Sequence, residues 1–389
     1  MRRLILKWDC EIPEKVFHLL SLGATEGVLC PGLRRLRWEA YSHTLPFYRL
    51  TISPTLTSLS LTYTSFFPES LEKELSIVQP VMMGLDTSSL QRLHLQLSIP
   101  KEASRQTESV VSSAVLRCGP ALVNLAVFSP RSDAAMQHIM QLPNLITWYA
   151  MNRPPMTLNL PLSNAFPRLD DLELVEEVSL EWLTLFTTTA HHASLEQNPH
   201  SPLNCGLVQR LDRLVTYPRV PIDAVFMAPI LLFRGLATLG LTSACYTPVP
   251  GCGFLLTDND ITEIATALPR LEEAVLGTVC SANSCQTTAA SLVSFSTRCR
   301  QLQHLEIHFK MKNLRHDLES VSADPRLDNL LSLQPRGVSH LSLSNAPYTI
   351  NEDDVVAVLK GFRRIFPSLV EISGNDTSWG ELNLRLREL

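Results

Sequence analysis

Long apolar segments are scarce in this sequence, although 45% of its 389 residues are hydrophobic. The longest uncharged apolar run, residues 224–233, is half of what a membrane-spanning helix needs, and it contains Pro229. At the N-terminus the apolar residues are interrupted by Lys7, Asp9 and Glu11, too early for the core of a secretory signal. We therefore expect no membrane span and no export, and place the chain in the cytoplasm or nucleus.

Charged residues make up only 18% of the chain, the net charge is −5, and no long run of one sign occurs. This balance favours neither nucleic acid nor an anionic membrane as a partner. The nine cysteines are scattered and odd in number, so they do not form a disulfide framework. We interpret them as reduced thiols, as is usual in the cytosol and nucleus.

Sets of residues that would carry catalysis or bind a metal are also missing. The pairs Cys280–Cys285 and Cys245–Cys252 lack the short C-x2-C spacing and the second half of a zinc module. The His191–His192 pair has no carboxylate or cysteine nearby, and adjacent side chains point apart on a helix or strand. The sequence predicts a protein that is not an enzyme, with no cofactor and no metal.

What the sequence does contain is a recurring phrase, clearest in CRQLQHLEIHF at residues 299–309. Its Leu302, Leu305 and Ile307 have the L-x-x-L-x-L spacing of a leucine-rich-repeat strand. The phrase occurs twelve times, with the first apolar position at Leu33, Leu56, Leu90, Leu122, Leu145, Leu169, Leu211, Leu236, Leu271, Leu302, Val338 and Leu369.

Two further regularities support the repeat. Seven of the twelve phrases have proline two residues before the first apolar position, where the overall proline content would give about one. The phrases follow one another at a mean spacing of about 31 residues, which accommodates one strand and one return helix per repeat. The repeat that begins at Leu211 is the weakest of the series, because the gap before it is 42 residues long.

Between the strand phrases the apolar residues change to helical spacing, as in residues 107–118, 257–268 and 352–366. Thr257 and Asp260 resemble a capping box at the start of one such helix. The predicted fold class is therefore an α/β right-handed leucine-rich-repeat solenoid of the ribonuclease-inhibitor type, with parallel strands on the concave face and helices on the convex face.

We predict a single solenoid domain over residues 1–389, with twelve to thirteen irregular repeats. The long gap after Leu169 holds an insertion, residues 175–210, or a further repeat that the pattern does not show, and the sequence does not reveal its structure. Residues 375–389 are predicted to cap the C-terminal end, and their leucines fit a helix or a strand equally well.

The candidate functional residues occupy the third and fifth positions of the strand phrases, which should project from the concave face. They are basic or aromatic in the first repeats and mainly acidic later, so a protein partner with an acidic part and a basic part could lie along them. A chance assortment of solvated charges is the alternative. The predicted partner-binding residues are Arg35, Arg37, Arg92, His94, Tyr149, Asp171, Glu173, Glu273, His304, Glu306 and Glu371.

Five stretches also resemble a known family, the F-box and leucine-rich-repeat proteins of basidiomycete fungi. They read CPGLRRLRWEA, SPTLTSLSLTYT, LLTDNDITEIATALPRLEEAVLG, SFSTRCRQLQHLEIHF and FPSLVEISGNDTSWGE. The similarity covers roughly residues 1–380, and the block from LTDNDI to HLEIHF, about 50 residues long, is its most specific part.

In that family an N-terminal F-box docks on the Skp-type adaptor of a cullin ubiquitin ligase, and the solenoid selects the substrate. Here only residues 12–20 resemble an F-box, and Cys30 already begins the next repeat. We interpret residues 13–22 as the first return helix, with Pro13 in its first turn, and expect no adaptor binding from them. The resemblance thus implies the substrate-recognition half of such a receptor. A regulator similar to GTPase-activating proteins and a general interaction scaffold remain alternatives.

Overall fold

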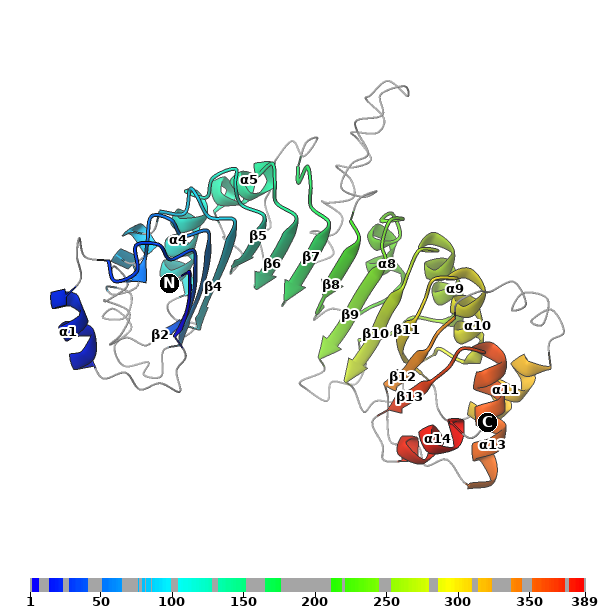
Figure 1. Cartoon of the computed structure of the whole chain (residues 1–389). Coiled ribbons are helices and arrows are strands. Elements are labelled where there is room, and N and C mark those ends of the chain that lie inside the picture. Colours follow the sequence, from blue (N-terminus) through cyan, green and yellow to red (C-terminus); the bar gives the residue numbers. More distant parts are fainter. Residues whose placement is uncertain are drawn as a thin grey trace, which may run out of the picture. The chain divides into compact units, whose positions relative to one another are not determined.

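The computed structural model describes the repeat strands and most of the helices that follow them (Figure 1). The chain divides into two compact units, Met1–Leu172 and Glu173–Leu389, which we describe separately. The described residues are 2–6, 14–23, 28–40, 51–64, 76, 79–80, 82–84, 86–98, 104–127, 132–151, 165–175, 211–218, 221–244, 253–279, 286–309, 314–323, 337–344, 352–374 and 378–387.

Each predicted strand phrase corresponds to one strand, and a further strand precedes the first phrase. The strands are β1 (Arg3–Leu6), β2 (Arg35–Ala40), β3 (Ser58–Thr64), β4 (Arg92–Ser98), β5 (Asn124–Val127), β6 (Thr147–Met151), β7 (Asp171–Val175), β8 (Arg213–Thr216), β9 (Thr238–Ala244), β10 (Glu273–Val279), β11 (His304–His308), β12 (His340–Ser344) and β13 (Glu371–Gly374). In the first unit β1 to β6 pair in chain order, and in the second β8 to β13 do so; every pairing is parallel.

Parallel pairing in register places equivalent repeat positions side by side. Leu305 of β11 lies opposite Ala274 of β10 and Leu341 of β12, and all three are buried. The first apolar position of all twelve phrases is buried as well, including Leu211 of the weakest repeat. The predicted fold class, an α/β leucine-rich-repeat solenoid built from parallel strands, is confirmed.

Backbone hydrogen bonds explain how each repeat enters its strand. The N–H groups of Gln303 and His304 both donate to the carbonyl of Glu272 in the preceding repeat, at 2.8 and 3.2 Å. The equivalent pair, Glu272 and Glu273, donates in the same way to Ala237. Because each repeat satisfies the backbone of its neighbour, a strand phrase is stable only within the stack.

Apart from α1, the return helices cover one side of the strands in each unit, and their apolar residues share a core with the buried strand positions (Figure 1). The described helices are α1 (Glu14–Gly23), α4 (Ser104–Val115), α5 (Asp133–Gln141), α8 (Ala224–Ile230), α9 (Asp258–Ala267), α10 (Ala289–Arg298), α11 (Leu314–Ser322), α13 (Glu352–Ile365) and α14 (Ser378–Leu386). Alternate strand residues point away from this core. We call the side of each sheet that carries the third and fifth phrase positions the open face.

Helix α9 begins at the capping box that the sequence predicts. The Asp260 N–H donates to the Thr257 hydroxyl at 3.3 Å, and the Thr257 N–H donates to the Asp260 carboxylate at 2.7 Å. Ile261, Ile264 and Ala265 are buried on the apolar side of the helix. The cap and the apolar stripe together determine where this helix starts and which side faces the strands.

A ladder of polar contacts joins α9 to α10. The carboxylate of Asp258 accepts from the Thr288 N–H and hydroxyl, both at 2.7 Å, and from the Ser291 hydroxyl at 2.5 Å. The Thr262 and Ser294 hydroxyls lie 2.8 Å apart one turn further on. Asp258, in the first turn of α9, therefore fixes the start of the next return helix.

We expect Asp258→Ala to lower the free energy of unfolding by about 2–3 kcal/mol, because three donors lose a charged acceptor. Urea denaturation followed by circular dichroism measures the change. Glu263→Ala is the matched control, since Glu263 is exposed on the same helix. Equal effects of the two substitutions would show that the ladder does not stabilise the unit.

Two of the cysteines predicted to be reduced lie buried where return helices end. The Cys299 thiol lies 3.5 Å from the Leu268 carbonyl oxygen and the Cys118 thiol 3.7 Å from that of Ala114. Burial raises the pKa of the Cys118 thiol to about 11 and that of Cys299 to about 12. Both side chains act as small apolar groups with a weak donor, and they stay protonated at neutral pH.

The C-terminal segment forms helix α14, which lies against the end strand β13 (Figure 1). The Asn383 side chain accepts from the Ile372 N–H at 2.7 Å and donates to the Ile372 carbonyl at 2.5 Å. Trp379, Leu382 and Leu386 are buried. A side chain thus replaces the next strand for part of β13, which reduces the exposed edge.

Helix α1 forms where the first return helix is predicted, yet its apolar residues are not covered. Leu19 and Leu22 are 68% and 84% exposed, whereas the apolar residues Ile261, Ile264 and Ala265 of α9 are buried. Other expectations concern residues outside the described part of the chain. These are the insertion after Val175, the pairs Cys280–Cys285 and Cys245–Cys252, and the His191–His192 pair.

Candidate binding pocket on the open face of the second unit

The register of the second unit aligns polar side chains from four neighbouring strands. The third positions of β10 to β13 lie side by side and form one row, Glu273, His304, His340 and Glu371. The fifth positions form the adjoining row, Val275, Glu306, Ser342 and Ser373. Since neighbouring strands are about 4.8 Å apart, side chains within a row can touch.

These two rows line a pocket with a volume of about 200 Å³. The residues around it are Glu273, Val275, His304, Leu305, Glu306, His340, Leu341, Ser342, Glu371 and Ser373. Four of them, Glu273, His304, Glu306 and Glu371, are among the residues that the sequence predicts to bind a partner. The repeat period therefore brings together residues that are up to 100 positions apart in the chain, from Glu273 to Ser373.

Two histidine rings form the middle of the pocket. The rings of His304 and His340 stack with their centroids 4.5 Å apart and an interplanar angle of 14°. On one side of the stack, the His340 Nε2 atom lies 3.8 Å from a carboxylate oxygen of Glu371. The Ser339 hydroxyl lies 2.8 Å from His340 Nδ1 and donates to the Gln303 carbonyl at 3.2 Å. These contacts hold the flat face of the ring pair in place.

The described lining carries three carboxylates and no lysine or arginine. Burial raises the pKa of the Glu306 carboxyl, because partial removal of water disfavours its charged form. Glu273 and Glu371 stand at the two ends of the histidine row. At neutral pH the pocket is thus a negatively charged cavity with an aromatic centre.

The predicted residues of the first unit also lie on its open face, on strands β2, β4, β6 and β7. The register aligns Arg35 with Ser58 and Arg92, and Arg37 with Ser60 and His94. Arg37 forms an ion pair with Glu39 at 3.1 Å, and its side chain is 60% exposed. Burial, with a smaller contribution from the charge of Arg37, lowers the pKa of His94.

The remaining predicted residues extend this pattern. Tyr149 lies in register with Ala126, which in turn neighbours His94. Asp171 opens β7, and its backbone N–H donates to the Ile146 carbonyl at 3.1 Å. The predicted arginines, His94 and Tyr149 therefore lie on strands of the first unit, while His304 and the predicted acidic residues other than Asp171 belong to the second.

Glu173 differs from the other predicted acidic residues because it already has a cationic partner. Arg213 of β8 donates to its carboxylate at 3.2 Å. The pKa of the nearby Tyr217 is raised, first by burial and then by the negative charge of Glu173. The positive charge of Arg213 opposes this increase without cancelling it. Glu173 is thus less available to a cationic partner than the carboxylates of the pocket. The change from basic to acidic residues along the open face of the whole chain stays a prediction, because it extends over both compact units.

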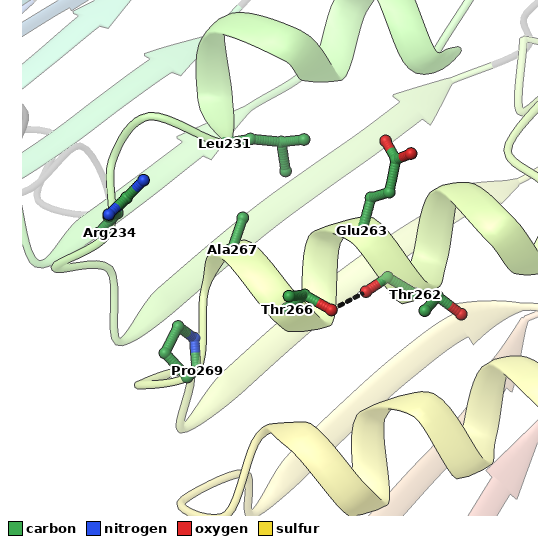
Figure 2. A pocket seen from close by; sticks show the side chains of 7 residues that line it. All are labelled: Leu231, Arg234, Thr262, Glu263, Thr266, Ala267 and Pro269. Atoms are coloured by element: carbon green, nitrogen blue, oxygen red, sulfur yellow. Dashed lines mark hydrogen bonds between the residues drawn. The ribbon is translucent and has the colours of Figure 1, made fainter.

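A second cavity lies on the helical side of the second unit, with a volume of about 560 Å³ (Figure 2). Leu231, Arg234, Thr262, Glu263, Thr266, Ala267 and Pro269 line it. Helix α8 has seven residues and α9 has ten, so the shorter helix leaves part of the α9 flank uncovered. We attribute this groove to the unequal helices, since its lining has no cluster of converging polar groups.

Sequence reasoning missed His340, Ser342 and Ser373, although the position rule would have found them. His340 and Ser342 occupy the third and fifth positions of the phrase that begins at Val338. The available signal was a histidine at the third position of two consecutive repeats, His304 and His340. Such a pair must be adjacent once the strands are parallel and in register.

Within the described part of the chain, no group of three or more histidine, cysteine, aspartate or glutamate residues is arranged to hold a metal ion. Over the same residues, no helix is long and apolar enough to cross a membrane. The carboxylates and imidazoles of the pocket are spread along two rows and do not converge on one point.

Comparisons with known proteins add little at the level of sequence. No family model matches the chain, and no curated protein matches it. Among the 38 chains of solved structures that match is the crystal structure of the Rad7 and Elc1 complex in yeast. The identity is 14% over 97% of this chain and 78% of that chain, with a TM-score of 0.35. We base no functional inference on a similarity of this size. By its own strand arrangement the chain is a leucine-rich-repeat-type α/β protein.

Proposed function

We propose that the chain is a non-enzymatic protein-binding module and that its partner binds on the open face of the second unit. The observation that carries the proposal is the pocket between β10 and β13, where charged and aromatic side chains project from a sheet whose backbone groups are already paired. A rigid strand platform loses little conformational entropy on binding, which favours specific association.

The arrangement of Ser339, His340 and Glu371 supports binding over catalysis. A nucleophilic serine needs a base that takes its proton and donors that stabilise the developing oxyanion. The Ser339 hydroxyl instead donates a hydrogen bond to the Gln303 carbonyl. It contacts the histidine that follows it directly in the chain, so the pair fixes the position of the ring.

Photo-crosslinking from the pocket tests the proposal. p-Benzoylphenylalanine is introduced at Ser342 in the pocket, and in a matched variant at the exposed Lys360 of α13. We expect a discrete protein adduct from position 342 in cells that express the full chain, and no such adduct from position 360. The captured protein is then purified and titrated against the unmodified chain.

In that titration, Ser342→Trp should fill the pocket and weaken binding about tenfold or more, a loss of about 1.4 kcal/mol. Lys360→Trp should change the affinity by less than about twofold, because it adds the same side chain on the helical side. Equal affinities of the two tryptophan variants, or adducts formed from position 360 alone, would contradict the proposal.

A finer proposal is that this module is the substrate-recognition half of an F-box-type ubiquitin-ligase receptor. It is supported by the five stretches that resemble that family, and the partner would then be a ubiquitination substrate. The captured protein should accumulate when the chain is depleted and should carry fewer ubiquitin conjugates in cells that express Ser342→Trp. If the half-life of the captured protein and its ubiquitin conjugates are unchanged, the ubiquitin-ligase proposal is wrong. The chain would then be a protein-binding module with another role.

A further inference from the structure

The pocket of the second unit has a lining that matches one kind of side chain. We propose that it binds an arginine side chain of the protein partner, whose guanidinium group stacks on the His304–His340 ring pair and is held by the surrounding carboxylates. This inference rests on the proposed function, because it names the chemical group that the same pocket recognises.

The stacked histidines supply the planar surface. Their rings are nearly parallel, 14° apart, and the contacts of His340 with Ser339 and Glu371 limit rotation of the ring. A guanidinium group is planar and weakly hydrated, so it stacks on aromatic faces more readily than an ammonium group does. A ring pair held in this way therefore favours arginine over lysine.

The three carboxylates supply the charge. Glu306 projects from β11 in the row next to the histidines, while Glu273 and Glu371 flank them on β10 and β13. The side chains of His340 and Glu371 are 45% and 56% exposed, so both can be reached from solvent. Carboxylates arranged around a flat surface can accept the forked N–H groups of a guanidinium, and such charge-assisted pairs are strong and directional.

Among these carboxylates, Glu306 is the one whose charged form is disfavoured by partial burial. The carboxyl is partly buried, which raises its pKa, and the described lining of the pocket brings no lysine or arginine to it. A guanidinium would provide that missing charge in a partly desolvated site, where a charge pair is worth more than at the surface. Glu173, in contrast, is already paired with Arg213, so the open face itself shows how one of its carboxylates accepts a guanidinium.

The proposal also has a definite pH dependence. The bound cation favours ionised Glu306, and the raised pKa means that this residue becomes neutral at a higher pH than an ordinary glutamate. Binding should weaken as the pH falls through that range. The other titratable groups that face Glu306 in the pocket are Glu273, His304, His340 and Glu371.

The direct test is a titration of the full chain with two synthetic pentapeptides, acetyl-Gly-Ser-Arg-Ser-Gly-amide and the same peptide with citrulline in place of arginine. Citrulline keeps the shape of arginine and removes its charge. Binding is followed at pH 7.5 through the Cε1–H NMR signals of histidines labelled with ¹³C, assigned with His304→Gln and His340→Gln. We expect the arginine peptide to shift both signals and the citrulline peptide to leave them in place.

Two variants sharpen the test. Glu306→Gln should weaken binding of the arginine peptide about fivefold or more, since it removes the negative charge of Glu306 and keeps the volume of the side chain. Glu263→Gln, on the helical side, should leave the dissociation constant unchanged within about twofold. A lysine version of the peptide should bind more weakly than the arginine version. Equal shifts with arginine and citrulline, or no shift with arginine, would overturn the proposal.

Failure of this inference can be told apart from failure of the proposed function. If a purified partner binds in a manner sensitive to Ser342→Trp but unaffected when its arginines are changed to alanine, the pocket binds protein through other groups and the arginine proposal is wrong. If the partner binds the Ser342→Trp variant as well as the original chain, the open-face function itself is wrong.

Discussion

Leu305→Ala is expected to lower the free energy of unfolding by about 2–5 kcal/mol. Leu305 is 1% exposed at the fourth position of the β11 phrase, next to Ala274 on one side and Leu341 on the other. The substitution removes three carbon atoms from a layer that the neighbouring strands hold in place, so the cavity cannot close fully. Urea denaturation followed by circular dichroism gives the change.

Gln303→Ala is the control for this prediction, because Gln303 is only half-buried and its backbone contacts do not depend on its side chain. It should change the stability by about 0.5 kcal/mol or less. A loss of less than about 1 kcal/mol for Leu305→Ala would mean that the buried positions of β11 are not closely packed.

Trp148→Ala should lower the stability of the first unit by about 3–5 kcal/mol. The Trp148 side chain is fully buried and stacks on Phe166, with ring centroids 5.4 Å apart and an interplanar angle of 23°. Phe166 itself has a φ of 54°, a conformation that costs a bulky residue free energy. Packing of the two rings therefore has to offset backbone strain as well as stabilise the core.

Thr147→Ala on the open face of the same strand is the matched control, with an expected change of about 0.5 kcal/mol or less. Tryptophan fluorescence is unsuitable here because the substitution removes one of the five tryptophans and so changes the signal itself. Urea denaturation followed by circular dichroism avoids this problem. If Trp148→Ala and Thr147→Ala cost the same, the ring stack does not stabilise the unit.

The fold could be predicted from the sequence because the same local rule recurs twelve times. Each phrase has apolar residues at its first and fourth positions, and ten of the twelve have one at the sixth, where Thr216 and Gly374 are the exceptions. The first and fourth positions become buried layers once the strands are parallel. Even the weakest phrase, at Leu211, forms strand β8. The start of helix α9 could be predicted as well, because the Thr257–Asp260 capping box depends only on residues within one turn.

The candidate site was only partly predictable. The position rule gives the side of the strand on which Glu273, Glu306 and Glu371 project, but it does not give the register that brings them together. His340 occupies the same third position as His304, so the position rule covers it, but only the register places the two rings against each other. The Arg213–Glu173 ion pair joins residues 40 positions apart in the chain, so no local signal could reveal it.

Helix α1 shows the limit of local reasoning in another way. Pro13 and the position of this segment before the repeat at Cys30 predict a return helix over residues 13–22, and α1 spans Glu14–Gly23. Spacing alone does not say what the apolar residues contact, and Leu19 and Leu22 remain exposed. Amphipathicity predicts that a face will be buried against something, whereas the identity of the covering surface depends on tertiary structure.

The most direct test of the open-face account is carboxyl footprinting with the captured partner. The full chain is modified with a carbodiimide and glycine ethyl ester, with and without saturating partner, and the labelling of each glutamate is measured by mass spectrometry. We predict that Glu273, Glu306 and Glu371 become several-fold less reactive in the complex, while Glu263 and Glu319 on the helices keep their reactivity. Protection of Glu263 and Glu319 with no change at the three pocket carboxylates would contradict the account.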